Sequence, residues 1–417
     1  MHKVLIFILL SLNLFATQVL EIKNDFVTHD SSNYLYYIQD IHDELNVNDI
    51  LKNTNLKIAS RVHLGTIRGG FWTKLTLKNS SDTKQILSLY NLLPGTNFID
   101  VHVFKKNKQV SFYQLGDLQK QNKREEISRF SMFNLLLDKN EEVTIVSKMK
   151  NYYVYNVGWK IEKRSDFTYK ETQYLLYFGI FSGIFIIFAF YNFFTFQIRK
   201  NIPYLIVSLN VLFTLLYLYG VNGILYQINV GLNLDLITAI TWNASSFLFI
   251  GLVLFPYYFF NIKKFYPKLK WYFRLKIMMA ISIIVLTLYA QFFDESYFFI
   301  FKTVGFASIF YCFSLLSTAI YMYYKKESGS QYYLLGQGLY LICILIYGLV
   351  LHGLMPYFFW FKILYPLGIT LDLIFFSVAL YYQKKMKNIE DIQNREYLLE
   401  KSRFSSIGQT IGHITHQ

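Results

Sequence analysis

Two histidines near the end of the chain carry the side chains best suited to chemistry. His413 and His416 lie in the segment 404–417, which reads FSSIGQTIGHITHQ. An imidazole is mostly neutral near pH 7, because its ordinary pKa is about 6.5, and the neutral ring is a nucleophile. A histidine of this kind, exposed on a helix, could accept a phosphoryl group from another domain.

The residues around these histidines predict the helix that would present them. Four apolar residues, spaced three, four and three apart, form one stripe of the kind that packs two helices together. They are Phe404, Ile407, Ile411 and Ile414. His416 lies two positions past this stripe, so we expect it to face away from the helix interface.

A carboxyl group inside an apolar stretch is the second candidate. An ionisable residue such as Asp372 is costly within a membrane span and suggests a function. A protonated carboxyl could form an interhelical hydrogen bond, which we favour, or it could contact a ligand. Interhelical packing by amides is expected in the same way at Asn192, Asn210 and Asn243. Gly179 and Gly183 form a GxxxG pair that we expect to pack within the molecule.

The composition indicates the setting in which these groups work. Of the 417 residues, 53% are hydrophobic and only 16% are charged, against about 25% charged in soluble domains. This excludes an ordinary cytosolic enzyme and a disordered chain. The formal charge of +14 suits cytoplasmic loops of a membrane protein, so no nucleic-acid partner is expected. Cys312 and Cys343 lie in apolar runs, and we expect no CxxC metal site.

The first 169 residues are predicted to form an exported β domain. Residues 1–16 place Lys3 before an apolar run of about 12 residues, which is typical of a signal peptide. In residues 17–169, apolar and polar residues alternate in runs at 71–77, 85–90, 98–104 and 142–147. Turn sequences separate these runs, which predicts an antiparallel, all-β, jelly-roll-like sandwich. Four scattered histidines are expected to be structural: His29, His42, His63 and His102.

Residues 173–382 are predicted to cross a membrane seven times. Seven apolar stretches can each form a spanning helix of about 20 residues, with centres near Ile184, Leu212, Leu248, Ile283, Phe310, Leu341 and Leu371. Basic residues gather in alternate loops, at 199–200, 263–276, 325–326 and 384–387. Because positive loops stay inside, we expect the β domain in the periplasm and the C-terminus in the cytoplasm.

A polar cytoplasmic helix is predicted to join the last span to the histidines. In residues 383–403 an apolar stripe typical of a coiled coil runs through Met386, Ile389 and Ile392. This stripe is out of phase with the stripe of residues 404–417. We therefore expect a register shift at 397–403.

The segment 404–417 resembles the start of the phosphoacceptor motif of bacterial sensor histidine kinases. The order of domains resembles the bacterial seven-transmembrane receptors with diverse intracellular signalling modules (7TMR-DISM), and segments 71–79 and 114–117 are similar to their periplasmic sensing domain. The resemblance implies that His416 is the phosphorylated histidine of an incomplete dimerisation domain, whereas His413 occupies a variable position. It also implies a homodimer in the bacterial inner membrane, with an unknown periplasmic ligand and a response regulator as partners.

Two departures from the kinase pattern and two rival functions accompany this resemblance. Gln417 stands where the commoner motif has an acidic residue that polarises the histidine. The ATP-binding domain, which would bring ATP and Mg²⁺, is missing from the 417 residues, so we expect this chain to be inactive alone and to bind no cofactor.

A receptor with another output, such as a diguanylate cyclase, would share everything up to residue 382 but not the motif. A transporter would need paired broken helices, and no symmetric pair is formed by Pro203, Pro256, Pro356 and Pro366.

Overall fold

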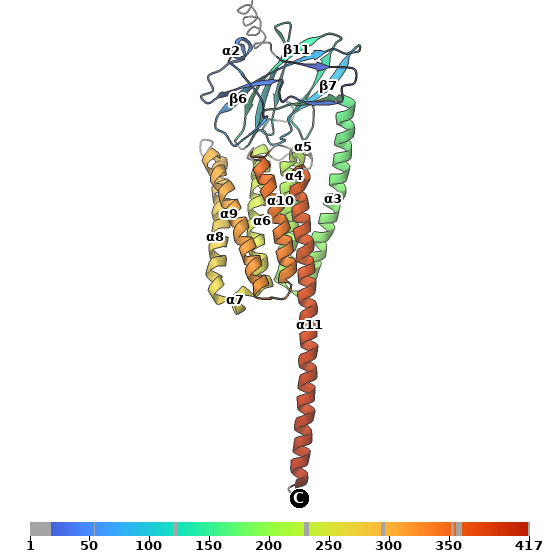
Figure 1. The fold of residues 1–417 in the computed structure, drawn as a ribbon, viewed down its shortest axis with the longest axis vertical. Helices are drawn as coiled ribbons and strands as arrows, with labels where there is room; N and C mark the ends of the chain where they lie inside the picture. Colours follow the sequence, from blue (N-terminus) through green and yellow to red (C-terminus); the bar gives the residue numbers. More distant parts are fainter. Residues whose placement is uncertain are drawn as a thin grey trace, which may run out of the picture.

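The computed structural model consists of a β domain, a helix bundle and one long projecting helix (Figure 1). It describes residues 18–415 except 54, 120–123, 125, 153, 229–232, 293–296, 352–353 and 356–360. The side chains of residues 290–292, 297–308, 351, 361–363 and 404–415 are not described. The β domain lies on the end of the bundle that carries α5 (Ile224–Ile228), and the projecting helix leaves from the opposite end (Figure 1).

The described strands of the β domain form three sheets. Their bounds are β1 (Val19–Ile22), β2 (Thr28–Asp30), β3 (Leu35–Asp40), β4 (Lys57–Ile58), β5 (His63–Gly65), β6 (Gly70–Asn79), β7 (Gln85–Tyr90), β8 (Phe98–Lys105), β9 (Lys108–Leu115), β10 (Met132–Leu137), β11 (Glu142–Lys150), β12 (Tyr155–Asn156) and β13 (Lys160–Lys163). The largest sheet has the order β4-β3-β6-β11-β8-β9, with β1 also paired to β6. The second has the order β10-β7-β13-β2, and β12 pairs with β5. A short helix, α2 (Val47–Lys52), follows β3.

The two larger sheets share one core, which confirms the predicted sandwich. Leu75 and Ile145 of the first sheet pack in the same buried cluster as Leu87 and Leu135 of the second. The four alternating runs lie in β6, β7, β8 and β11, since alternation places one apolar face on each strand. The described strand pairs are antiparallel except β1 with β6, which is parallel.

Six helices of the described part are long and apolar enough to cross a membrane. They are α3 (Arg164–Arg199), α4 (Ile202–Val221), α6 (Leu234–Phe259), α8 (Lys270–Phe292), α10 (Ser330–Leu351) and α11 (Phe361–Thr415). A further helix, α9 (Tyr297–Tyr324), has an apolar segment over Ile309–Tyr324. Between α6 and α8 lie two short turns of helix, α7 (Ile262–Phe265) and η3 (Pro267–Leu269). These helices agree with the predicted bundle of seven.

Small residues bring neighbouring helices of the bundle into close contact. A Cβ added at Gly220 of α4 would collide with Thr241 of α6, and one added at Gly251 of α6 would collide with Asn210 of α4. Without those side chains, α4 and α6 approach closely enough for extensive van der Waals contact, which stabilises helix pairs in a membrane.

One expectation about the first membrane helix was wrong. The helix α3 begins at Arg164, directly after β13 and before the predicted membrane region at 173. Gly179 and Gly183 do not pack within the molecule, because a Cβ added at either position would meet nothing within 4 Å. This GxxxG pair therefore faces outward, on a helix that lies at the side of the bundle (Figure 1).

The last helix links the bundle to the end of the chain without a break. α11 has 55 residues, which corresponds to a length of about 80 Å. The register shift expected at 397–403 does not interrupt it. Beyond the bundle, the apolar stripe of Met386, Ile389 and Ile392 is exposed.

Candidate functional site

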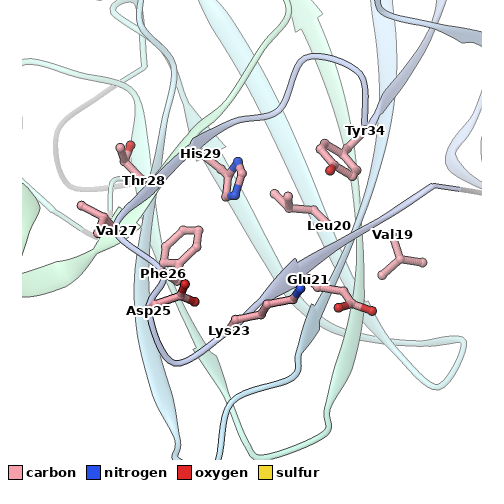
Figure 2. A pocket seen from close by; sticks show the side chains of 10 residues that line it. All are labelled: Val19, Leu20, Glu21, Lys23, Asp25, Phe26, Val27, Thr28, His29 and Tyr34. Atoms are coloured by element: carbon pink, nitrogen blue, oxygen red, sulfur yellow. The ribbon is translucent and has the colours of Figure 1, made fainter.

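The β domain has an open pocket where the chain passes from one sheet to the other, between β1 and β2 (Figure 2). Its volume is about 530 Å³, within the range of small-molecule sites. The His29 ring stacks on Phe26 at a centroid distance of 5.6 Å and meets Tyr34 edge-on at 6.5 Å. The other lining residues are Val19, Leu20, Glu21, Lys23, Asp25, Val27 and Thr28.

The lining of this pocket suits binding. Charges of both signs lie around it, from the carboxylates of Glu21 and Asp25 and the ammonium of Lys23. Together with the aromatic rings, these groups can hold a small polar molecule. His29, which we expected to be structural, points into the space between β1 and β2 (Figure 2).

Arg129 joins the β domain to the bundle. Its guanidinium forms a two-pronged ion pair with Glu171 of α3, with Nε–Oε1 and Nη2–Oε2 distances of 2.6 and 3.1 Å. The same group lies 3.9 Å above the ring of Tyr174, and Nη1 donates to the carbonyl oxygen of Asn222 at 3.4 Å. Only 4% of the Arg129 side chain is exposed, so the charge depends on these partners.

The turn after α4 fits directly beneath the β domain. Gly223 has a φ of +76°, a conformation that favours glycine. A Cβ there would also collide with the carbonyl oxygen of Arg129 and approach Pro94 to 2.9 Å. The turn therefore has no space for a side chain. We call this contact region, formed by Arg129, Glu171, Asn222 and Gly223, the joint.

A buried carboxyl lies beside the joint. Asp117 is 3% exposed; it accepts a hydrogen bond from Asn97 Nδ2 at 3.0 Å and another from the Tyr226 hydroxyl of α5. The Tyr226 oxygen also lies 2.8 Å from Thr238 Oγ1 of α6. Burial raises the pKa of Asp117 to about 6, although the Asn97 bond and the Arg124 charge oppose this shift.

We expect this carboxyl to make stability depend on pH. The pKa of Asp117 rises from 3.8 to about 6 on folding, so the folded state binds the proton more tightly. The contribution of Asp117 to the free energy of unfolding, roughly 3 kcal/mol, is fully present below about pH 4 and is lost as the pH rises through 6. Melting temperatures of the wild type and Asp117→Asn between these values test this. The wild type should lose stability relative to the variant as the pH rises; a constant difference would contradict the raised pKa.

The candidate carboxyl of the membrane region lies between two helices. Asp372 of α11 is 3% exposed, and Gln337 of α10 donates from Nε2 to both of its oxygens, at 3.0 and 3.2 Å. A Cβ added at Gly336 would come within 2.9 Å of Asp372 Oδ1. The carboxyl group therefore lies directly against the backbone of α10.

Other polar residues of the bundle lie differently from expectation. Lys276, which we counted among the basic loop residues, is buried within α8; its Nζ donates to Ser314 O at 2.8 Å and to Thr318 Oγ1 at 2.7 Å. Asn192 and Asn243 were expected to pack between helices. The hydrogen bond that each side chain donates goes to a carbonyl oxygen one turn earlier in its own helix.

The predicted phosphoacceptor follows the last helix directly. α11 ends at Thr415, and His416 lies outside the described residues. The backbone at His413 is helical. The helix thus runs unbroken from Asp372 in the bundle to the residue before His416.

Comparisons with known families agree with this layout. The family model described as 7TM diverse intracellular signalling matches residues 174–383, about half of the chain. The model described as 7TMR-DISM extracellular 2 matches residues 32–163. The chain belongs to the 7TMR-DISM family. No curated protein matches it.

Membership of the 7TMR-DISM family identifies the two domains of this receptor. Residues 32–163 of the β domain form the extracellular sensory domain, and the bundle is the seven-transmembrane domain. The protein is a multi-pass membrane sensor, and the family resemblance noted from the sequence is confirmed. The histidine-kinase output stays a prediction.

Sequence reasoning missed the residues that join the two domains of this 7TMR-DISM receptor. Arg129 and Glu171 are 42 positions apart, and no spacing rule connects them. Asp117 lies in the segment that resembles the family's sensing domain, but we assigned it no role. The signal available in the sequence was the position of Asp117, a carboxyl residue inside the segment 114–117 that resembles the family's sensing domain.

Proposed function

We propose that the chain is the sensory and transmembrane part of a sensor histidine kinase of the bacterial inner membrane. The protein would detect a periplasmic stimulus and control transfer of the ATP γ-phosphoryl group to His416, and from there to an aspartate of a response regulator. The single observation that carries this proposal is the unbroken helix α11, which leads from the membrane into the histidine motif at 404–417.

A path for the signal supports the proposal. The stimulus would bind in the β domain, where the pocket between β1 and β2 has the size of a small-molecule site. The joint and the direct connection of β13 to α3 would pass a change in the β domain to the bundle. Since α11 packs against α10 through Asp372 and Gln337, a shift of the bundle would move the helix that bears His416.

Labelled phosphate tests the proposed output. The chain, extended after Gln417 by the rest of the dimerisation domain and the catalytic domain of a histidine kinase, is incubated with ATP that carries a labelled γ-phosphate. We expect label that is lost in acid and kept in base, as for phosphohistidine, and its transfer to a response regulator. A membrane receptor with a cyclase output would take up no such label.

Reporter fusions test the proposed orientation. Basic residues of alternate loops predict a periplasmic β domain and a cytoplasmic C-terminus. An alkaline phosphatase joined after Asp117 should therefore be active, and one joined after Lys387 should be inactive. Equal activity of the two fusions would contradict the orientation.

A further inference from the structure

An open pocket lies where η3 and α8 face α9, near the end of the bundle opposite the β domain. Its volume is about 370 Å³, within the range of small-molecule sites. The residues that line it are Leu269, Tyr272, Phe273, Ser317, Thr318 and Tyr321. Figure 1 shows α7, which precedes η3 and α8 in the chain, at the end of the bundle from which α11 projects. We call this space the α8–α9 pocket.

The surroundings of the α8–α9 pocket are typical of the interface between a membrane and water. Trp271 and Tyr324 are 74% and 80% exposed, and aromatic rings of this kind gather at the level of the lipid headgroups. Residues 263–276 contain six basic and no acidic residues. After α9, the ammonium group of Lys325 lies 5.7 Å from the ring centroid of Tyr321, which lines the pocket. The pocket therefore opens where lipid headgroups meet a strongly basic surface.

A buried ammonium group lies directly behind the wall of the pocket. Lys276 is 2% exposed; its Nζ donates to Thr318 Oγ1 at 2.7 Å and lies 4.2 Å from the ring centroid of Tyr272. No carboxylate forms an ion pair with Lys276 among the described side chains, and Glu327, on the turn after α9, accepts a hydrogen bond from the Tyr266 hydroxyl. A buried charge without a partner is costly within a membrane. Lys276 therefore favours an anion in the pocket.

We propose that the α8–α9 pocket binds one anionic phospholipid of the surrounding membrane. Leu269 and Phe273 hold the upper part of an acyl chain, and the Ser317 hydroxyl and the Lys325 ammonium group hold the phosphate at the opening. Basic pockets between membrane helices bind acidic headgroups in this way. A zwitterionic headgroup brings its own cation, which the basic residues repel, so a net negative charge is favoured. The lipid would bind whatever output domain follows α11.

Thermal unfolding of the purified full-length chain in a non-ionic detergent tests this site. One series of samples receives phosphatidylglycerol, a second receives phosphatidylcholine and a third receives inorganic phosphate. We expect phosphatidylglycerol to raise the melting temperature by about 2–4 °C in a saturable way, because a ligand that binds only the folded state stabilises it. Phosphatidylcholine should cause a clearly smaller rise, and inorganic phosphate, which has no acyl chain, should cause none.

Two substitutions alter the pocket and leave the buried Lys276 in place. Ser317 is exposed at the edge of the pocket, so Ser317→Phe should fill the opening without disturbing the core, and it should abolish the response to phosphatidylglycerol. Lys325→Gln removes one positive charge and should raise the half-maximal phosphatidylglycerol concentration about fivefold, as for one basic residue near a lipid surface.

A lysine in a similar setting elsewhere provides the matched control. Lys200 follows α3 directly, and its ammonium group lies 6.0 Å from the ring centroid of Phe196. Figure 1 shows α3 and α8 on opposite sides of the bundle. Lys200→Gln removes the same charge at a distance from the pocket, so the response to phosphatidylglycerol should stay unchanged.

Native mass spectrometry gives a readout that does not depend on stability. The wild type should retain one phosphatidylglycerol molecule, and Ser317→Phe should retain none. Equal rises with both lipids, a full response in Ser317→Phe, or an equal loss in Lys200→Gln and Lys325→Gln would overturn the proposal, because general attraction to a basic surface needs no pocket. A rise with inorganic phosphate alone would also overturn it, since the site would then bind a free anion.

Discussion

Replacement of His416 by glutamine is expected to abolish phosphorylation completely. Glutamine has a similar reach but offers no nucleophilic nitrogen, so it cannot attack the γ-phosphorus of ATP. The chain extended by the rest of the dimerisation domain and a kinase catalytic domain, and carrying His416→Gln, should keep no acid-labile label above background. The extended protein without this substitution should label strongly.

The neighbouring histidine provides a matched control. His413 lies three residues earlier in the same segment, at a position that varies in the motif resembled by 404–417. His413→Gln should therefore retain most of the label. Label that survives His416→Gln and disappears in His413→Gln would show that the motif is aligned three residues out of place.

Replacement of Arg129 by leucine is expected to cause the largest loss of stability. The substitution removes the guanidinium from Glu171, whose side chain is only 14% exposed, and also from the face of Tyr174. Removal of one partner from a buried ion pair costs about 3–5 kcal/mol, because the other charge is left uncompensated. The melting temperature of the full chain should fall by roughly 10 °C.

An exposed ion pair of the same domain is the control for this substitution. Lys139 and Asp82 lie 3.2 Å apart, with 56% and 75% of their side chains exposed. Because water screens such pairs, Lys139→Ala should leave the melting temperature almost unchanged. If Arg129→Leu and Lys139→Ala shifted the melting temperature equally, the joint would not hold the two domains together.

Local pattern was sufficient to predict the spanning helices and four strands of the sandwich, β6, β7, β8 and β11, but not the other described strands. Alternating residues predicted β6 and β11 because each strand buries one face in the sandwich. The length of the apolar stretches predicted the spanning helices because the bilayer sets a minimum length. The family could be recognised because both signals occur in the order that the family has.

Contacts between segments that are far apart in the sequence could not be predicted from local sequence pattern. The parallel pairing of β1 with β6 and the bond from Tyr226 to Asp117 depend on how separate elements meet in space. Lys276 shows the same limit, because a count of charges does not reveal that this side chain folds inward between α8 and α9. Within the bundle, the sequence indicated Asp372 as important, but its hydrogen-bond donor Gln337 became visible only in the packed structure.

The unbroken course of α11 limits how its far end can be re-engineered. A helix turns by about 100° for each residue, so insertion of one residue beyond the bundle would swing everything after it to another side. Insertion of seven residues would restore the original direction to within about 20°. Chimeric proteins that graft a new output domain onto this receptor therefore need linkers chosen by angular phase, with length alone a poor guide.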